Sequence, residues 1–191
     1  MRSLIDPEDA ARGLRRVAGE IVECHRGIAG LLLVGIRRGG LPVAEHLATL
    51  IAETEGQVPL GSVDIALYRD DASTSLPSPT IGPTRLPLSL EGRSVVLCDD
   101  VLFTGRTIRA ALDALLDYGR PARVQLCVLI DREGRELPIQ ADYVVKKVQV
   151  ERHERVDVLA SSGSFSAVAV PFDHPTTPPP APEGPAPGGR S

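Results

Sequence analysis

The chain has 191 residues, 42% of them hydrophobic, which is enough for one globular domain with a sizeable core. Its formal net charge of −4 argues against a globally basic, histone-like nucleic-acid binder. Aromatic residues make up only 3% of the chain, which argues against an aromatic platform for single-stranded nucleic acid. We therefore expect one domain whose function depends on a local site.

Cysteine usage and the N-terminus point to a cytoplasmic protein. The three cysteines, Cys24, Cys98 and Cys127, form no CxxC pair, so the sequence predicts neither a disulfide framework nor a zinc site. No apolar run approaches the roughly 18 residues that suggest a membrane helix. Acidic residues follow Arg2 closely, which is unlike a signal peptide.

The first third of the chain predicts alternating helices and strands. Asp6 followed by Pro7 and two acidic residues is typical of a helix start, and an apolar stripe at helical spacing continues to Ile28. The apolar run at residues 31–36 predicts a buried strand. We expect a helix from about Leu41 to Thr54 and an alternating strand over residues 63–68.

The middle and end of the chain continue this alternation after a long loop. The polar and proline-rich stretch from Arg69 to about Glu91 is predicted to be a functional lid or disordered. We then expect a helix from Thr104 to about Tyr118 and strands at residues 94–98, 123–130, 143–150, 156–160 and 166–170. Strands that alternate with helices predict an α/β fold with a parallel sheet and right-handed crossovers.

The last segment differs from the rest in composition. Residues 171–191 hold eight prolines and almost no apolar side chains, so they cannot bury enough surface to offset the entropy of ordering. We predict a domain at residues 1–170 and a disordered tail at residues 171–191. The alternative is a proline-rich ligand for a partner, supported only by Pro178-Pro179-Pro180.

The stretch from Val95 to Thr107 carries the most chemical information. An apolar strand delivers two carboxylates, Asp99 and Asp100, to its carboxyl end, where open α/β sheets bind ligands. A turn with hydroxyl groups then opens a helix, whose free N–H groups suit a phosphate. Acids beside a phosphate site fit a ribose 5-phosphate. The alternative is an ordinary loop whose acids cap the helix. Neither a GxxxxGK[ST] loop nor a GxGxxG loop after a strand is present.

This stretch resembles the phosphoribosyl-diphosphate signature of type I phosphoribosyltransferases. The further segments 34–39, 64–71, 119–121 and 131–139 narrow the resemblance to the uracil phosphoribosyltransferases that also regulate pyrimidine operons. It covers about residues 5–170. It implies a type I phosphoribosyltransferase fold: a twisted, mainly parallel sheet flanked by helices, with a small hood and a mobile lid loop.

The resemblance also implies roles for matching positions. Asp99 and Asp100 would bind the ribose 2′ and 3′ hydroxyls, residues 104–107 would hold the 5′-phosphate, and Arg37 and Arg38 would stabilise the leaving diphosphate. These two acids and two arginines are the expected catalytic residues. Phosphoribosyl diphosphate would contact Arg37, Arg38 and Gly39, together with the whole signature: Val95, Val96, Leu97, Cys98, Asp99, Asp100, Val101, Leu102, Phe103, Thr104, Gly105, Arg106 and Thr107.

Two further segments would enclose the substrates. Arg69, Asp70 and Asp71 would begin the lid, whose closure would exclude water. Residues 131–146, the hood segment, would cover the base, with Asp131, Arg132 and Lys146 as candidates. No Cys/His/acid cluster suggests a metal held by the protein, so Mg²⁺ is expected to arrive on phosphoribosyl diphosphate.

Phe103 bears on the choice of base. Purine-salvage relatives carry an Asp at this slot to handle the purine ring, and Phe cannot take a proton. We therefore rank hypoxanthine–guanine salvage low and expect uracil and phosphoribosyl diphosphate to give UMP and diphosphate. Two alternatives stay open: a regulator with only vestigial catalysis, and a phosphoribosyltransferase for another base such as orotate.

The resemblance implies a second role in uridine-nucleotide-dependent binding to the leader of pyrimidine-operon mRNA, which causes transcriptional attenuation. It also implies a homodimer. Family members that bind RNA tend to have basic residues or His where this chain has Gly19, Gly134 and Gln140. The candidates for RNA contact are Arg15, Arg16, Arg135, Lys146 and Lys147, and the alternative for each is a role in surface solubility or helix capping.

Overall fold

The computed structural model describes residues 1–66, 68 and 84–172. The lid candidates Arg69, Asp70 and Asp71 and the tail from residue 173 onward lie outside the described residues. Three helices and eight strands make up the described part: β1 (Arg2–Ile5), α1 (Pro7–His25), β2 (Leu31–Ile36), α2 (Gly40–Ala52), β3 (Leu60–Val63), β4 (Ser94–Leu102), α3 (Arg106–Leu116), β5 (Arg123–Arg132), β6 (Tyr143–Val148), β7 (Glu154–Ser161) and β8 (Ser164–Pro171).

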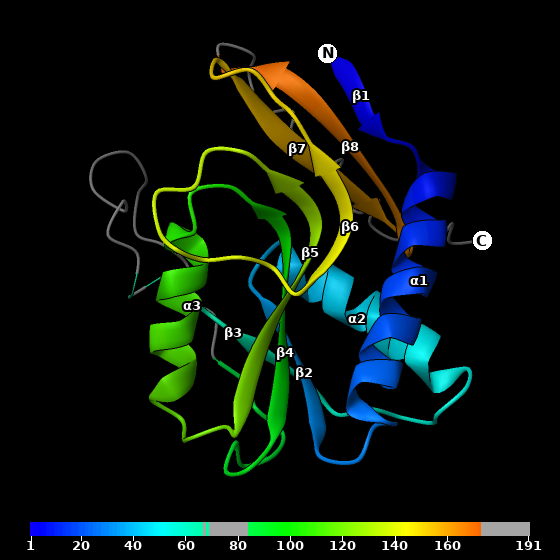
Figure 1. Ribbon diagram of the computed structural model, residues 1–191, viewed down its shortest axis with the longest axis vertical. Helices are drawn as coiled ribbons and strands as arrows, with labels where there is room; N and C mark the ends of the chain where they lie inside the picture. The colour runs from blue at the N-terminus through cyan, green and yellow to red at the C-terminus, as the bar shows by residue number, and fades with distance from the viewer. Residues whose placement is uncertain (67, 69–83, 173–191) are drawn as a thin grey trace, which may run out of the picture.

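A five-stranded parallel sheet forms the centre of the molecule (Figure 1). Its strand order is β3-β2-β4-β5-β6, and every neighbouring pair is parallel. Because β4 is the middle strand, residues beyond its carboxyl end lie between those of β2 and β5. The predicted α/β fold with a parallel sheet is confirmed.

Helices cover both faces of this sheet. Alternate strand residues point to opposite faces, so Leu31 and Leu33 of β2 belong to one core with α1 and α2, while Leu32 and Val34 belong to the other with α3. Figure 1 shows α3 on one side of the sheet and α1 and α2 on the other. The strands are apolar on both faces, as the continuous apolar runs predicted.

The first helix begins as its sequence predicts. Asp6 is the N-cap and its carboxylate accepts a hydrogen bond from the Asp9 N–H at 2.8 Å, while Pro7 occupies the first turn. Its buried face includes Leu14, Val17 and Ile21, three members of the predicted stripe. This face packs α1 against the sheet, which positions the strands that carry the candidate site.

A second sheet was not predicted. β1, β8 and β7 form a three-stranded antiparallel sheet, of which β1 is an edge strand only four residues long. The turn between β7 and β8 places Ser162 and Gly163 at positive φ, the geometry of a two-residue hairpin. Such a hairpin forces antiparallel pairing, so these late strands do not extend the parallel sheet.

One prediction about the region after α2 was wrong. The strand expected at residues 63–68 ends at Val63, because the Asp64 carboxylate accepts the Ala66 N–H at 2.9 Å and turns the chain. Among the described residues, no helix or strand lies between β3 and β4, which agrees with the predicted loop, but the last part of this loop contacts the folded domain. Arg85 exchanges backbone hydrogen bonds with Ser62 at 2.8 Å, and Leu90 is completely buried.

Two further observations concern the cysteines and the helices. Cys98 and Cys127 are buried free thiols, as predicted, and Cys24 is exposed. In the described part of the chain, no helix is both long and apolar enough to span a membrane.

Candidate active site

The candidate site lies where the strand order of the parallel sheet reverses. The chain leaves β2 to form β3 on one side of it and later returns to form β4 on the other side. Loops from the carboxyl ends of β2 and β4 therefore diverge and leave a crevice, the usual ligand position in open α/β sheets. Arg37, Arg38 and Gly39 follow β2, and Asp99 and Asp100 lie near the end of β4.

The acidic pair lies within β4 rather than after it. The expected strand end at Cys98 was four residues short, because β5 continues alongside and Asp99 pairs with Val128 and Leu102 with Asp131. Asp99 is buried, with 4% of its surface exposed, and its carboxylate accepts the Asp100 N–H at 3.0 Å. Continued pairing holds both carboxylates in a rigid strand.

Asp100 is half-buried next to Asp99. Its Oδ1 accepts the Val101 N–H at 2.8 Å. Burial raises the pKa of the Asp100 carboxyl, and the hydrogen bond from Val101 acts in the opposite direction. The Asp100 carboxylate is therefore partly desolvated by the fold itself.

Two glycines bring the loop after β2 against the acidic pair. A Cβ atom at Gly39 would lie 2.1 Å from Oδ2 of Asp100, and one at Gly40 would lie 2.0 Å from the Cys98 carbonyl oxygen. Both distances are shorter than real Cβ contacts, so a side chain at Gly40 would clash with backbone and one at Gly39 would have to displace the Asp100 carboxylate. The predicted diphosphate loop and the predicted ribose acids are therefore adjacent, although they are about 60 residues apart in the sequence.

The arginines before these glycines differ in exposure. Arg37 is half-buried, and its Nε lies 3.4 Å from Oγ of Ser62 on β3. Arg38 is exposed, and the peptide bond that joins the two residues is cis. Both arginines therefore belong to the loop after β2 that approaches the acidic pair through Gly39.

A cavity of about 310 Å³ lies at the turn between β4 and α3. We call it the loop cavity, and residues 101–108 line it. Gly105 caps α3 at a φ of +92° and has no side chain to cap the helix, while the Thr104 hydroxyl accepts the Arg106 N–H at 3.3 Å. The first turn of α3 holds no acidic residue, so its free N–H groups and positive dipole end suit an anion.

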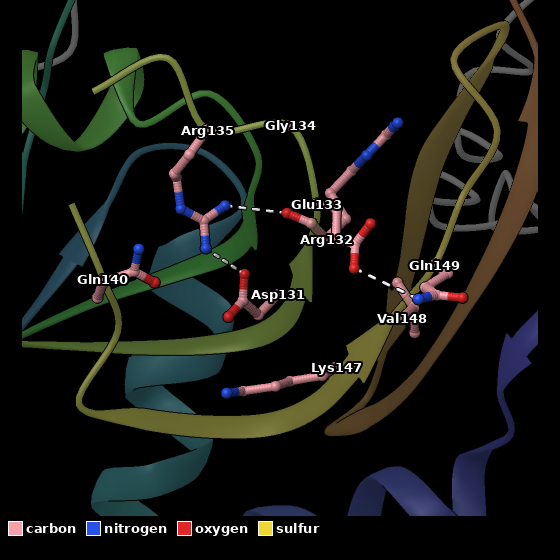
Figure 2. Close-up of a pocket in the computed structure, with 9 residues that line it drawn as sticks. All are labelled: Asp131, Arg132, Glu133, Gly134, Arg135, Gln140, Lys147, Val148 and Gln149. Carbon is pink, nitrogen blue, oxygen red and sulfur yellow. Dashed lines mark hydrogen bonds and ion pairs between the residues drawn. The ribbon is translucent and has the colours of Figure 1, made fainter. Parts of the chain in front are cut away.

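A second cavity, of about 450 Å³, lies beside the hood segment (Figure 2). We call it the hood cavity. Figure 2 shows that its lining comes from the end of β5, the segment that follows it, and β6. Lys147 is exposed and Lys146 half-buried. The lining residues are Asp131, Arg132, Glu133, Gly134, Arg135, Gln140, Lys147, Val148 and Gln149.

Arg132 and Phe103 join the two cavities. The Arg132 guanidinium carbon lies 4.0 Å from the centre of the Phe103 ring, a cation–π contact. Arg132 is 3% exposed, and its Nε has no hydrogen-bond partner among the described residues. Burial lowers its pKa, against the attraction of Glu154. A buried cation with an unused donor suits a ligand with an acceptor atom.

The same ring explains one departure from the family pattern. Gly134 has a φ of +119°, and a Cβ atom there would lie 2.2 Å from the Phe103 ring. Any side chain at this position would therefore displace the ring or strain the backbone. In this chain Phe103 occupies the space that a larger residue at position 134 would need.

The candidate RNA residues do not all present free charge. Arg16 donates to the carbonyl oxygens of Val144 and Val145 at 2.9 and 3.0 Å, which ties α1 to β6. Arg15 is exposed and pairs with Glu53 at 3.1 Å. The guanidinium of Arg135 is mostly buried among backbone carbonyls.

Sequence reasoning missed several of these contacts. Gly40 was not singled out, although its close approach to β4 is as strict as that of Gly39. The Arg106–Glu136 ion pair, with an Nε–Oε2 distance of 2.6 Å, joins α3 to the hood segment and was also not expected. The two glycines in succession after a buried strand are the signal that could have indicated the first contact.

Comparison with known proteins agrees with this arrangement. Residues 4–161 match the family described as phosphoribosyl transferase domain. The chain belongs to this family. The match spans both β2 with its following loop and the strand that carries the acidic pair, so the crevice lies wholly within the family domain.

Curated relatives in this family carry one name. The chain is 53% identical to the "Bifunctional protein PyrR" of Roseiflexus sp., over 81% of this chain and 85% of the relative. It is 52% identical to the protein of the same name from Geobacter sulfurreducens, over 89% of this chain and 94% of the relative. Matches that cover 85% and 94% of these relatives support the resemblance drawn from the motifs.

Solved structures support the fold alone. A hypoxanthine phosphoribosyltransferase from Trypanosoma cruzi, in complex with the product IMP, has a TM-score of 0.61 at 21% identity, covering 78% of this chain and 76% of that one. One from Staphylococcus aureus has a TM-score of 0.62 at 23% identity, covering 78% and 77%. The type I phosphoribosyltransferase fold is therefore confirmed.

Proposed function

We propose that this chain is a uracil phosphoribosyltransferase that joins uracil to phosphoribosyl diphosphate and releases UMP and diphosphate. The proposal depends mainly on the close approach of Gly39 to the Asp100 carboxylate, which brings the proposed diphosphate loop next to the proposed ribose site. The loop cavity, at the start of α3, supplies the third part, a phosphate site. Family membership and the PyrR relatives support the same assignment.

In the reaction, the N1–C1′ bond forms while the bond from C1′ to the diphosphate oxygen breaks. Diphosphate leaves with the bonding electron pair, and the N1 proton is released. Positive charge develops on the ribose, where the carboxylates of the buried Asp99 and the half-buried Asp100 stabilise it electrostatically. Arg37 and Arg38 stabilise the negative charge that grows on the diphosphate.

The oxygen atoms of the candidate site indicate how Mg²⁺ would be bound. Among the described residues, no three His, Cys, Asp or Glu side chains gather into a metal site. The oxygen donors of the acidic pair nevertheless suit a hard cation brought in by a diphosphate. Mg²⁺ bound to phosphoribosyl diphosphate neutralises part of its charge, and the acidic pair would be its nearest protein ligands.

The uracil ring would occupy the hood cavity. Arg132 supplies an unused buried donor for a carbonyl oxygen of the base, and its stack on Phe103 forms the wall between this cavity and the loop cavity. Phe103 offers no acidic group to a purine ring. This arrangement favours a small pyrimidine with two carbonyl oxygens over hypoxanthine or guanine.

A base panel tests this proposal. Purified protein, phosphoribosyl diphosphate and Mg²⁺ are incubated in turn with uracil, orotate, hypoxanthine and guanine, and the nucleotide product is quantified. We expect UMP to form at least ten times faster than the other nucleotides, since one well-placed hydrogen bond is worth about that factor. Faster turnover of orotate would assign another base, and no turnover of any base would favour a regulator with vestigial catalysis.

The second role that we propose is regulation by binding pyrimidine-operon leader mRNA when uridine nucleotide is bound. The word "bifunctional" in the relatives' name supports it, as does the exposed Lys147 at the mouth of the hood cavity. Nucleotide would have to bind the RNA-competent state more tightly than the other state. A homodimer would present Lys147 twice.

A further inference from the structure

The hood segment is tied to the turn before α3 by a set of hydrogen bonds centred on Arg135. Its Nη1 donates to the carbonyl oxygens of Phe103 at 2.6 Å and Arg132 at 2.9 Å, and its Nε donates to that of Ile139 at 2.9 Å. Its other amino group pairs with the Asp131 carboxylate. With 17% of the side chain exposed, the guanidinium is occupied within the protein (Figure 2).

The backbone after Arg135 extends the same attachment. The N–H groups of Glu136 and Leu137 both donate to the Thr104 carbonyl oxygen, at 3.0 and 3.1 Å. Two consecutive carbonyls of the turn, those of Phe103 and Thr104, are therefore held toward the hood segment. The Arg106–Glu136 ion pair closes the attachment on the far side of the turn.

Fixing these carbonyls also fixes the N–H groups that follow them. In a trans peptide unit the C=O and the next N–H point in opposite directions, and both the 103–104 and 104–105 bonds are trans. The N–H groups of Thr104 and Gly105 must therefore point away from the hood segment. These residues line the loop cavity, where successive N–H groups make an anion nest.

We propose that Arg135 is a positioning residue for the 5′-phosphate of the nucleotide. It does not touch the phosphate but holds the Phe103 carbonyl and, through the turn that it stabilises, keeps the nest N–H groups aimed at the phosphate. Arginine suits this task because its planar group offers five donors in a rigid fork, whereas lysine offers one compact ammonium group. The inference rests on the proposed function, since it requires that the loop cavity holds a nucleotide phosphate.

The test compares a ligand that has the phosphate with one that lacks it. Dissociation constants for UMP and uridine are measured by NMR titration for the wild type, Arg135→Gln, Arg135→Lys and the control Arg123→Gln, an exposed arginine at the opposite, amino end of β5. For Arg135→Gln we expect UMP to bind about 10-fold more weakly while the uridine constant changes less than about twofold. Arg135→Lys should lie between it and the wild type, and the control should match the wild type.

Other patterns overturn the inference. Equal losses for UMP and uridine would place the effect of Arg135 on the base or on the whole fold, and unchanged UMP binding would mean that Arg135 positions nothing. If Arg135→Gln does not fold, Arg135→Lys decides by the same comparison. Failure of the wild type to bind UMP would instead refute the proposed function itself.

Discussion

Asp100→Asn should separate catalysis from stability. The change keeps an oxygen that can accept the Val101 N–H, which Oδ1 now accepts at 2.8 Å, but it removes the negative charge beside the ribose. A hydrogen bond to a charged group is worth about 1.5–3 kcal/mol. Because the variant also loses the negative charge that stabilises the transition state, we expect turnover to fall by roughly 100-fold or more.

The same variant should be at least as stable as the wild type. Burial raises the folded-state pKa of Asp100 above its unfolded value, so ionisation of this carboxyl destabilises the fold. That penalty is absent below the unfolded pKa, develops as the pH rises through the folded pKa, and is complete above it. The melting temperature of Asp100→Asn should therefore exceed that of the wild type at pH 7, and the difference should vanish at about pH 3.5.

Two assays check this prediction: UMP formation under saturating substrates, and thermal melts between pH 3.5 and pH 8. Asp113→Asn, which removes an exposed carboxylate of α3 that pairs with Arg109, is the matched control and should leave turnover unchanged. Turnover of Asp100→Asn within a factor of about three of the wild type would mean that the ribose site lies elsewhere. If Asp100→Asn melts below the wild type at pH 7 but matches it at pH 3.5, burial is not the cause of the raised pKa.

Three further predictions use other parts of the chain. Gly39→Ala should lower turnover at least ~10-fold by pushing the Asp100 carboxylate aside, as steady-state kinetics will show, and near-normal turnover would refute the close approach. Truncation after Phe172, whose N–H donates to the His153 carbonyl, should shift the melting temperature by less than about 2 °C, and a larger loss would show that the proline-rich tail packs on the domain. Arg15→Gln should weaken leader-RNA binding in gel shifts and reduce the slope of log K against log salt concentration by about one, without changing turnover. If the wild type fails to bind leader RNA at low salt with saturating UMP, the regulatory role is refuted.

Sequence reasoning succeeded where the determining interactions are local. The Asp6 cap and the helix that follows it depend on contacts within four residues, and they were predicted correctly. The strand and turn at residues 95–107 were also predicted from local sequence, because an apolar run, two acids and small turn residues follow each other directly. The fold class followed from the same alternation.

Other features depend on contacts between distant segments. β1 has only four residues and gains its partner, β8, from the other end of the domain. The end of β4 was misplaced because its last residues continue pairing with β5, which no local pattern records. The contact of Gly39 with Asp100 requires the crossover topology, and the role of Arg135 requires the carbonyl of Phe103, 32 residues away in the sequence.

A crystal structure of the protein with UMP tests the central claim most directly. We expect the 5′-phosphate within about 3 Å of N–H groups or hydroxyls of residues 104–107, the ribose hydroxyls on Asp99 and Asp100, and the uracil ring in the hood cavity beside Arg132. UMP bound with its phosphate in the hood cavity, or bound away from the acidic pair, would contradict it.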